Sequence, residues 1–532
     1  FYGALYLLGS VLAQQGQYAQ ARVSLEKAIA VHPEKKVAYF NLAKILLDLN
    51  EAEAAFGRIC AYLAMDPLDG EAHVVKASAL LALDRAGEAL TVLDHALSLA
   101  PDLAEAHYNR GNAFKSLSRF NEAVADYRRA MLLKPDIVAF HINCGVALHA
   151  LGQFEEALAC YESALRLVPT SADALSNRGT SLHALGRFDE ALTSFGSAVT
   201  CDPEHSEAKA NRAYTSLLLG DFATGWDDFE HRLRSRDYVR IALGQNAGMM
   251  ERVIRCPQIS DISGQHVTLI GEQGIGDIIM FCSMVDDVLR HAARIDLIVE
   301  ERLCALLATS FPTIRVMPIE HFNPSMIAAD ARCIFIGSLG SLFRRTRESF
   351  PQTHYLSIDA AKRSSWNQRI GAGAGKRIGI SWQGGLAHTR RGARSMPLSD
   401  FLRIFEGQAD LDFVNLQHGF DPEEVRAATD AGARIQSFTA NELYDLSELG
   451  ALIASLDCVV TVQNSNVHLC GALGVPCLAI LPALPEWRYG LDEAKMPWYG
   501  SVELFRRDAS GGLAHLLPAL RARLAGVLGR VG

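Results

Sequence analysis

Six prolines in the first half of the chain follow one another at a strict interval of 34 residues: Pro33, Pro67, Pro101, Pro135, Pro169 and Pro203. An interval this regular indicates a repeat array rather than one irregular globular domain. The same register aligns one glycine column, two alanine columns and one aromatic column. These columns are Gly9, Gly111, Gly145 and Gly179; Ala21, Ala89, Ala123, Ala157 and Ala191; Ala28, Ala96, Ala130, Ala164 and Ala198; and Tyr18, Phe120, Phe154, Phe188 and Phe222. We expect each glycine to face an alanine so that two helices approach closely, and each proline to end a second helix.

This period and pattern resemble the tetratricopeptide repeat, in which each repeat is a helix, a turn and a second helix. The proline expected after Pro203 is missing, because position 237 is aspartate. We therefore predict that the array covers residues 1–236. Its last part is predicted to be a capping helix that contains Gly225, Trp226, Phe229 and Arg234.

Composition limits the class of protein. The chain has 532 residues, of which 49% are hydrophobic, enough for the array and one or two further cores. No run of about 18 uncharged apolar residues occurs, so no membrane span is expected. Residues 1–13 are apolar but carry Gly9 in repeat register and no basic flank, so we interpret them as a repeat helix; the missing initiator methionine leaves room for a start upstream. The 11 scattered cysteines fit free thiols in a reducing cytoplasm, and the net charge of −9 argues against a nucleic-acid partner.

Beyond the array, residues 237–264 are interpreted as a connector or, alternatively, as an ordered strap across the next domain. Short apolar runs then alternate with helical patterns, which is typical of parallel α/β structure. In a first lobe, residues 265–370, strands are predicted at 266–270, 295–299, 313–317 and 333–337, with a crossover helix at 276–292. In a second lobe, residues 371–532, strands are predicted at 377–381, 412–417, 433–438, 458–462 and 477–481, with a closing helix at 513–528. The predicted fold class is a superhelix of repeats followed by two Rossmann-like lobes that face a cleft.

Two polar turns stand at the ends of predicted strands. Gly274-Ile275-Gly276-Asp277 follows the first strand and opens a helix, where free backbone N–H groups attract anionic or polar ligand atoms. The simpler interpretation is a tight turn in which Asp277 is an N-terminal helix charge. Gln463-Asn464-Ser465-Asn466 marks a second helix start after strand 458–462, and capping by Asn464 or Ser465 explains part of that run.

Three blocks carry a more specific resemblance. The segments are GEQGIGDIIMF, GISWQGG with RSMPL, and VVTVQNSNVHLCGALGVPCLAILPALPEWRYG with MPWYGSVELFRR. They resemble bacterial tetratricopeptide-repeat glycosyltransferases related to the lipopolysaccharide heptosyltransferases. The resemblance covers essentially the whole chain and implies a GT-B fold, with acceptor on the first lobe and nucleotide-sugar donor on the second. Many relatives have Asp-Thr where this chain has Gln463-Asn464, which puts the usual donor in doubt.

The resemblance implies roles for individual residues. Asp277 becomes the candidate catalytic base on the turn of Gly274 and Gly276, with Glu272 as the fallback. A carboxylate at a helix N-terminus is expected to have a low pKa. The donor side is expected to include Trp382, Gln383, Gly384, Arg394, Gln463, Asn464, Ser465, Asn466 and His468.

Simpler interpretations stand beside some of these roles. Trp382 also fits a packed aromatic residue, and His468 also fits a hydrogen-bonded core residue. A basic cluster of His388, Arg390, Arg391 and Arg394 suits phosphate but also fits a solvated loop. Asp410-Leu411-Asp412 imitates a metal motif of the other glycosyltransferase fold; it precedes a strand in the wrong context, so we predict no metal and no cofactor beyond the nucleotide-sugar co-substrate.

One further column holds asparagines at Asn41, Asn109, Asn143, Asn177 and Asn211. Asparagine in a helix interior costs about half a kcal/mol relative to alanine, so the column needs a reason. Local hydrogen bonding at a tolerant exposed site is one hypothesis. The other is a ladder on the concave face that grips an extended acceptor peptide, similar to the ladder of eukaryotic O-linked N-acetylglucosamine transferase.

Together with these observations, the resemblance implies a cytoplasmic, inverting, metal-independent glycosyltransferase that modifies Ser or Thr hydroxyls of a protein, with flagellin as the expected acceptor. A glycosyltransferase acting on lipopolysaccharide or another glycan is the first alternative. A non-catalytic tetratricopeptide scaffold is the second.

Overall fold

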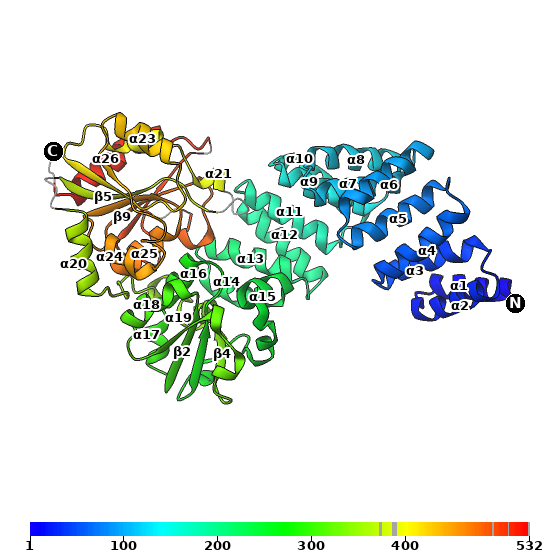
Figure 1. Ribbon diagram of the computed structural model, residues 1–532, viewed down its shortest axis with the longest axis horizontal. Helices are drawn as coiled ribbons and strands as arrows, with labels where there is room; N and C mark the ends of the chain where they lie inside the picture. The colour runs from blue at the N-terminus through cyan, green and yellow to red at the C-terminus, as the bar shows by residue number, and fades with distance from the viewer. Residues whose placement is uncertain (372–374, 386–390, 492–493, 509, 530–532) are drawn as a thin grey trace. The chain divides into compact units, whose positions relative to one another are not determined.

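A computed structural model describes residues 1–371, 375–385, 391–491, 494–508 and 510–529 (Figure 1). The chain divides into two units, which we call the N-terminal unit (Phe1–His205) and the C-terminal unit (Ser206–Gly532). His388 and Arg390, as well as residues 372–374, lie outside the described residues.

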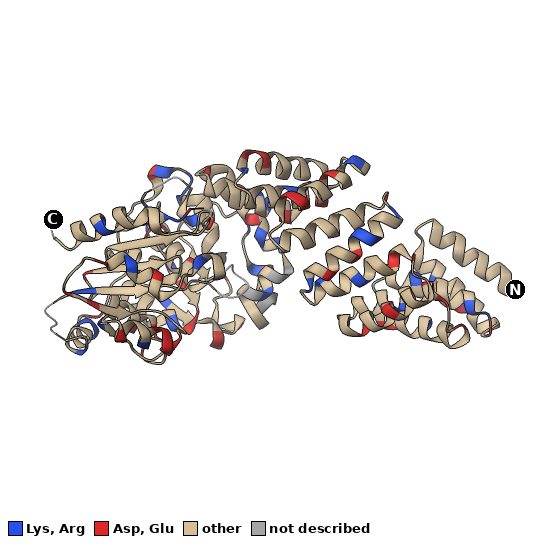
Figure 2. Cartoon of the chain, turned by 90° about the horizontal axis from the view of Figure 1, so that it is seen from above, with Lys and Arg blue, Asp and Glu red and all other residues tan. Residues whose placement is uncertain are grey.

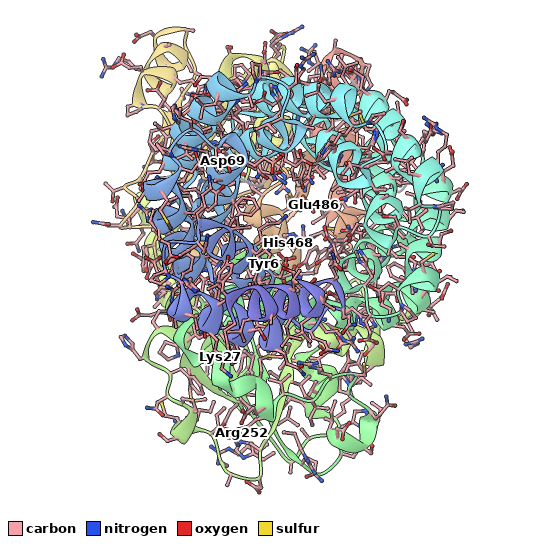
Figure 3. All side chains as sticks on the ribbon, turned by 90° about the vertical axis from the view of Figure 1, so that its right-hand side faces the viewer. Tyr6, Lys27, Asp69, Arg252, His468 and Glu486 are labelled. Carbon is pink, nitrogen blue, oxygen red and sulfur yellow. The ribbon has the colours of Figure 1, made fainter. Side chains whose placement is uncertain are left out.

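The N-terminal unit is a succession of helical hairpins. Its helices are α1 Tyr2–Gln14, α2 Tyr18–Val31, α3 Lys36–Asp48, α4 Ala52–Met65, α5 Gly70–Ala82, α6 Ala86–Leu99, α7 Ala104–Ser116, α8 Phe120–Leu133, α9 Val138–Ala150, α10 Phe154–Leu167, α11 Ala172–Ala184 and α12 Phe188–Cys201. Each repeat proline lies just after a second helix, as predicted. Seen along the array, the helices curve into a superhelix (Figure 3). Acidic and basic residues are interspersed along these helices rather than gathered by sign (Figure 2).

Three of the repeat glycines, Gly111, Gly145 and Gly179, make room for an aromatic ring of the second helix. A Cβ added to Gly111 would lie 2.6 Å from the ring of Tyr127, and one added to Gly145 would lie 2.5 Å from the ring of Tyr161. At Gly9 the nearest groups are the Leu25 side chain and the carbonyl oxygen of Ala21, the alanine of the predicted pairing; at Gly111, Gly145 and Gly179 the nearest group is a buried aromatic side chain of the second helix. Its ring occupies the volume that a larger first-helix side chain would need.

The C-terminal unit opens with a helical hairpin, α13 Ser206–Leu218 and α14 Phe222–Phe229, followed by the 3-10 helix η1 Glu230–Arg234 and helix α15 Arg236–Leu243. The predicted capping helix thus ends at Phe229, and Arg234 lies in η1. The segment after α15 continues through η2 Gly244–Arg252 to an ordered stretch, in which the Ile254 N–H donates to the Cys333 carbonyl at 2.8 Å. This part of the predicted connector lies along the edge of the first sheet, as the strap alternative supposed.

The first sheet is parallel, in the order β3-β2-β1-β4. Its strands are β1 His266–Ile270, β2 Arg294–Val299, β3 Arg315–Pro318 and β4 Arg332–Phe335. Its helices include α16 Ile275–Cys282, α17 Val285–Leu289, α18 Glu301–Ser310 and α19 Gly340–Phe343. The predicted single crossover helix is broken between α16 and α17, where the N–H groups of Ser283 and Met284 bond three residues back, to Met280 and Phe281.

The second sheet is also parallel, in the order β10-β9-β8-β5-β6-β7. Its strands are β5 Lys376–Ser381, β6 Leu411–Asn415, β7 Ile435–Gln436, β8 Cys458–Val462, β9 Cys477–Leu481 and β10 Val502–Arg506. Its helices are α20 Ala360–Arg369, α21 Arg391–Arg394, α22 Leu398–Leu402, α23 Pro422–Asp430, α24 Leu446–Ile453, α25 Ser465–Leu473 and α26 Leu517–Val527. All nine predicted strands correspond to strands of the two sheets, and β10 is an additional one.

Strand order creates one switch point in each sheet. The chain moves outward from β1 through β2 to β3 and then returns to β4 on the other side of β1. It likewise moves from β5 through β6 to β7 and returns to β8 beside β5. Ligands of open parallel sheets bind at the carboxyl ends of the strands beside such a point. Both polar turns found in the sequence, after β1 and after β8, lie there.

Candidate functional site

Two helix N-termini, one from each sheet, meet in the C-terminal unit. Helix α16 begins after Gly274, and α25 begins after Asn464. A Cβ added to Gly276 would lie 2.9 Å from Cδ2 of His468 and 3.6 Å from Cα of Ser465. Glycine at 276 therefore permits the first turn of α16 to pack against α25, and the two polar turns become one site.

Asp277 lies in the first turn of α16 and forms an ion pair with Arg488, which belongs to the 3-10 helix η10 Trp487–Tyr489. Both side chains are only 13% exposed. Burial raises the pKa of Asp277, and the positive charge of Arg488 offsets part of this rise. The low pKa expected from the helix N-terminus is therefore wrong in direction, because desolvation outweighs the favourable charges.

Glu272, the fallback base, is buried and fully engaged. Its carboxylate accepts two hydrogen bonds from Arg232, at 2.6 and 3.0 Å, and one from the Gly337 N–H at 2.7 Å. The Tyr238 hydroxyl donates to it as well. Burial alone would lower the pKa of Arg232, but the nearby Glu272, Tyr238 and Glu230 together more than reverse this and raise it well above its ordinary value. Glu272 thus anchors η1 to the end of β1.

The four polar residues after β8, Gln463–Asn466, make different contacts. Asn464 caps α25 by accepting from the Asn466 N–H at 3.0 Å, and its amide donates to Ser381 at 2.8 Å. Asn466 is buried and donates to the Leu416 carbonyl at 3.2 Å. Capping and bracing account for these two residues. Ser465 is exposed in the first turn, and the buried Oε1 of Gln463 has no hydrogen-bond partner among the described residues.

The loop after β5 lies against the loop after β8. A Cβ added to Gly384 would lie 2.3 Å from the Gln463 carbonyl oxygen, so only glycine fits. The Gln383 side chain accepts a hydrogen bond from Arg391 at 2.6 Å. Trp382 is fully buried and donates to Glu424 at 2.9 Å, which makes it a packed core residue at the strand end. Gln383 and Gly384 are the members of this loop that border the switch point.

A row of alternating charges crosses the site. Arg394 pairs with Glu486, Arg488 Nη1 lies 3.8 Å from Glu486 Oε2, and Arg488 pairs with Asp277. Sequence reasoning missed Glu486 and Arg488. Both stand in the segment PEWRYG after β9. They reach the site because β9 lies beside β8, and the sequence alone does not reveal that neighbourhood.

His468 is inside the protein rather than at the surface of the site. Its ring lies 3.3 Å from the hydroxyls of both Tyr499 and Tyr489, and its side chain is buried. Burial, reinforced by the charge of Arg488, lowers the pKa of His468 well below its ordinary value. The imidazole is therefore neutral and supports the packing of α25.

The asparagine column lies on first helices, and all five side chains are half-buried. The Asn41 amide donates to the Tyr6 hydroxyl at 3.0 Å, the Asn109 amide to Ser78 at 2.9 Å, and the Asn143 amide to the Tyr108 hydroxyl at 2.9 Å. Each bond reaches the first helix of the preceding repeat. These amides therefore tie neighbouring repeats together; a role of the column, including Asn177 and Asn211, in peptide binding stays a prediction.

A cavity of about 400 Å³ adjoins the turn after β1. It lies at the carboxyl ends of the first sheet's strands and is lined by Gly271, Gln273, Ile278, Glu300, Ile319 and Phe322, among others. Asp410 and Asp412, by contrast, lie at the amino end of β6, where Asp412 pairs with Arg434 at 2.9 Å. The described residues hold no group of three or more His, Cys, Asp or Glu side chains suited to a metal ion.

Comparisons with known proteins identify the class of the first unit. Residues 6–69 and 104–137 match families described as tetratricopeptide repeat, and residues 147–186 match one described as TPR repeat. The chain therefore has an N-terminal tetratricopeptide superhelix, followed by a region of parallel sheets. Among the described helices, none is both long enough and apolar enough to cross a membrane.

Particular relatives share parts of the chain. It is 27% identical over 313 residues to Protein FlbA of Caulobacter vibrioides, which covers 56% of this chain and 51% of FlbA. The chain thus spans about half the length of this curated relative. TTC0263, a thermophilic TPR protein of Thermus thermophilus, is 25% identical and matches 34% of this chain and 100% of its own, with a TM-score of 0.32. YrrB, described as a TPR protein with an unusual peptide-binding site, is 24% identical and matches 35% of this chain and 95% of its own, with a TM-score of 0.29.

Proposed function

We propose that the C-terminal unit is a GT-B glycosyltransferase, and that it moves a sugar from a nucleotide donor to a Ser or Thr hydroxyl of a protein held by the repeats. The supporting observation is the meeting of two helix N-termini, from two parallel sheets, at Gly276. A helix N-terminus favours anions, and Ser465 opens α25. The Gln383 carbonyl accepts from the cap residue Asn464, and Arg394 lies beside Gly384, which packs against Gln463. Donor phosphate would bind there, without a metal, and acceptor would approach the turn that carries Asp277.

The proposed chemistry is a direct displacement. The acceptor oxygen forms a bond to the anomeric carbon while the bond from that carbon to the phosphate oxygen breaks, and the electron pair leaves with the nucleotide. Asp277 takes the hydroxyl proton, and the configuration inverts. Its raised pKa makes it a better base than an ordinary aspartate. Arginines and the α25 N-terminus stabilise the charge on the leaving phosphate.

The acceptor side of the proposal rests on the repeats and on the sequence resemblance. Flagellin is the proposed acceptor, and the cytoplasm is the proposed compartment. A non-catalytic scaffold is a second candidate, favoured by one observation: Asp277, Arg488, Glu486 and Arg394 already pair with one another. Transfer to lipopolysaccharide or another glycan remains the alternative for the acceptor.

The test is transfer by the purified full chain, after thermal-shift screening against nucleotide sugars. We expect one nucleotide sugar to stabilise the protein, transfer to survive EDTA, and Asp277→Asn to lower turnover by about 10²–10⁴ with little change in donor affinity. Asp286→Asn, on the exposed side of α17, is the matched control and is expected to keep full activity. Stabilisation by none of the donors, or full activity of Asp277→Asn, would contradict the proposal.

A further inference from the structure

We propose that Glu486 is an internal counter-ion that occupies the place of a donor phosphate, and that the nucleotide must displace it in order to bind. This inference rests on the proposed function and deepens it, since it names the group with which the donor competes. Figure 3 labels Glu486 and His468 within the C-terminal unit.

The geometry places Glu486 between two arginines. It follows β9, the neighbour of β8, so its loop lies at the same sheet edge as Gln463 and Asn464. Its Oε1 pairs with Arg394, and its Oε2 lies 3.8 Å from Arg488 Nη1. A carboxylate shared by two guanidinium groups is what a phosphate would replace, because phosphate oxygens accept from arginine in the same forked manner.

Exposure indicates which member of this row can move. The side chains of Arg394 and Arg488 are 15% and 13% exposed, and Glu486 is 31% exposed. Arg488 also lies over the ring of Trp487, with 5.5 Å from its guanidinium to the ring centroid, and it keeps Asp277 as a second partner. The arginines are therefore held in place, whereas Glu486 can swing into solvent.

The surroundings favour an anion once Glu486 has moved. Arg391, beside Arg394 in α21, adds a third positive charge and contacts Gln383. The first turn of α25 contributes its N-terminal dipole and the exposed Ser465. Next to the α25 N-terminus, the buried Oε1 of Gln463 is a hydrogen-bond acceptor that no donor of the described residues reaches. Glu486 thus neutralises the two arginines and prevents other anions from binding to them. A donor with enough negative charge replaces it.

Calorimetric titration of the full chain with inorganic pyrophosphate and with inorganic phosphate tests this inference. Glu486→Gln keeps the side-chain shape but removes the charge, so we expect it to bind pyrophosphate about tenfold more tightly than the unchanged protein. Phosphate is expected to gain less, and comparing the two ligands shows whether one or two phosphate groups enter. Adding Arg394→Gln to Glu486→Gln should abolish the gain.

Two controls separate this effect from general electrostatics and from misfolding. Glu406→Gln breaks another surface ion pair of this unit, with Arg521 at 2.7 Å, and should leave pyrophosphate affinity unchanged. Glu486→Ser provides a second neutral variant if Glu486→Gln fails to fold, and the melting temperature of each variant checks this. Unchanged or weaker pyrophosphate binding in the folded neutral variants would overturn the inference.

Pyrophosphate binding requires no turnover, so the two proposals can fail separately. Tighter binding by Glu486→Gln, in a protein that transfers no sugar, would support the counter-ion and contradict the glycosyltransferase. Sugar transfer with no effect of Glu486→Gln on pyrophosphate affinity would support the glycosyltransferase and contradict the counter-ion.

Discussion

Asp277 is held by two opposing electrostatic effects. Burial disfavours its charged form and raises its pKa, while Arg488 favours the charged form and lowers it. A general base works best with a pKa near the operating pH. In the proposed reaction, Arg488 would therefore tune the proton affinity of Asp277 as well as form an ion pair with it.

Replacing Arg488 should shift the pH dependence of turnover. Loss of the positive charge in Arg488→Gln raises the pKa of Asp277 further, so the carboxylate becomes protonated at a higher pH. The acid limb of the pH–rate profile is therefore expected to move to higher pH, and Arg488→Lys should move it less. The measurement is turnover against pH at saturating donor. An acid limb that stays in place in Arg488→Gln would show that Asp277 is not the titrating base.

The predictability of this site varies from residue to residue for physical reasons. The turn at Gly274–Asp277 and the helix start at Asn464 were readable, because turn and cap residues report local backbone geometry. The raised pKa of Asp277 was not readable, since burial depends on which elements cover the turn. The positions of Glu486 and Arg488 could not be predicted for the same reason, because they reach the site only through the pairing of β9 with β8.

At the scale of single elements, the asparagine column is part of the joint between consecutive first helices. The Asn143 amide donates to the Tyr108 hydroxyl, and its oxygen accepts from Lys115 at 2.6 Å. These bonds span adjacent repeats and would stabilise the curvature of the array. They also occupy atoms that a peptide ladder would need.

A pair of variants separates the two roles of the column. Tyr108→Phe removes one hydrogen-bond partner of Asn143 without removing the asparagine, whereas Asn143→Ala with Asn177→Ala removes two ladder positions. If the column grips peptide, the double variant should weaken acceptor-protein binding by about 0.5–1.5 kcal/mol per lost bond, and Tyr108→Phe should not. Binding of the acceptor protein is the measurement, with thermal unfolding of each variant alongside. Equal acceptor binding by all variants would leave the column a purely structural joint.

Helices and strands were easier to predict from the sequence than the way in which they pack against one another. The 34-residue period fixed the helical hairpins, because each repeat must present the same face to the next. Buried parallel strands were readable as short apolar runs, but β10, an edge strand, was missed because Glu503 and Arg506 interrupt the apolar run of Val502–Arg506. The break between α16 and α17 was also missed, since the apolar pattern continues across it.

At the scale of the whole C-terminal unit, an aromatic cluster joins the opening hairpin to both sheets. Trp226 of α14 is buried, with its ring centroid 5.6 Å from that of Trp487 and 6.3 Å from that of Phe281. Its indole N–H donates to the Arg344 carbonyl at 2.8 Å, and a Cβ added to Gly340 would lie 2.6 Å from its ring. The hairpin therefore packs as part of this unit, although its sequence continues the repeat.

This packing predicts which fragment folds. A fragment of residues 206–532 keeps Trp226 and Arg232, so it should unfold cooperatively on heating. A fragment of residues 237–532, cut at the end of the predicted array, loses both. It leaves Glu272 as an unpaired buried charge, at about 3–5 kcal/mol, and opens the space of a tryptophan, at about 3–5 kcal/mol. Together these losses rival the roughly 5–15 kcal/mol by which domains are typically stable.

Circular dichroism during heating compares the two fragments, and point variants of the full chain serve as controls. Trp226→Ala and Glu272→Gln should each lower the melting temperature of the C-terminal unit. Trp226→Ala leaves a cavity, and Glu272→Gln leaves the buried Arg232 without the negative charge of its partner. Glu320→Gln, exposed at the same end of the first sheet, should change it little. Equal melting of the two fragments would mean that the hairpin belongs energetically to the repeats, as the sequence-based boundary at residue 236 supposed. Early unfolding of the shorter fragment alone would show that the last hairpin of the repeat pattern is a structural component of the sheet-bearing unit.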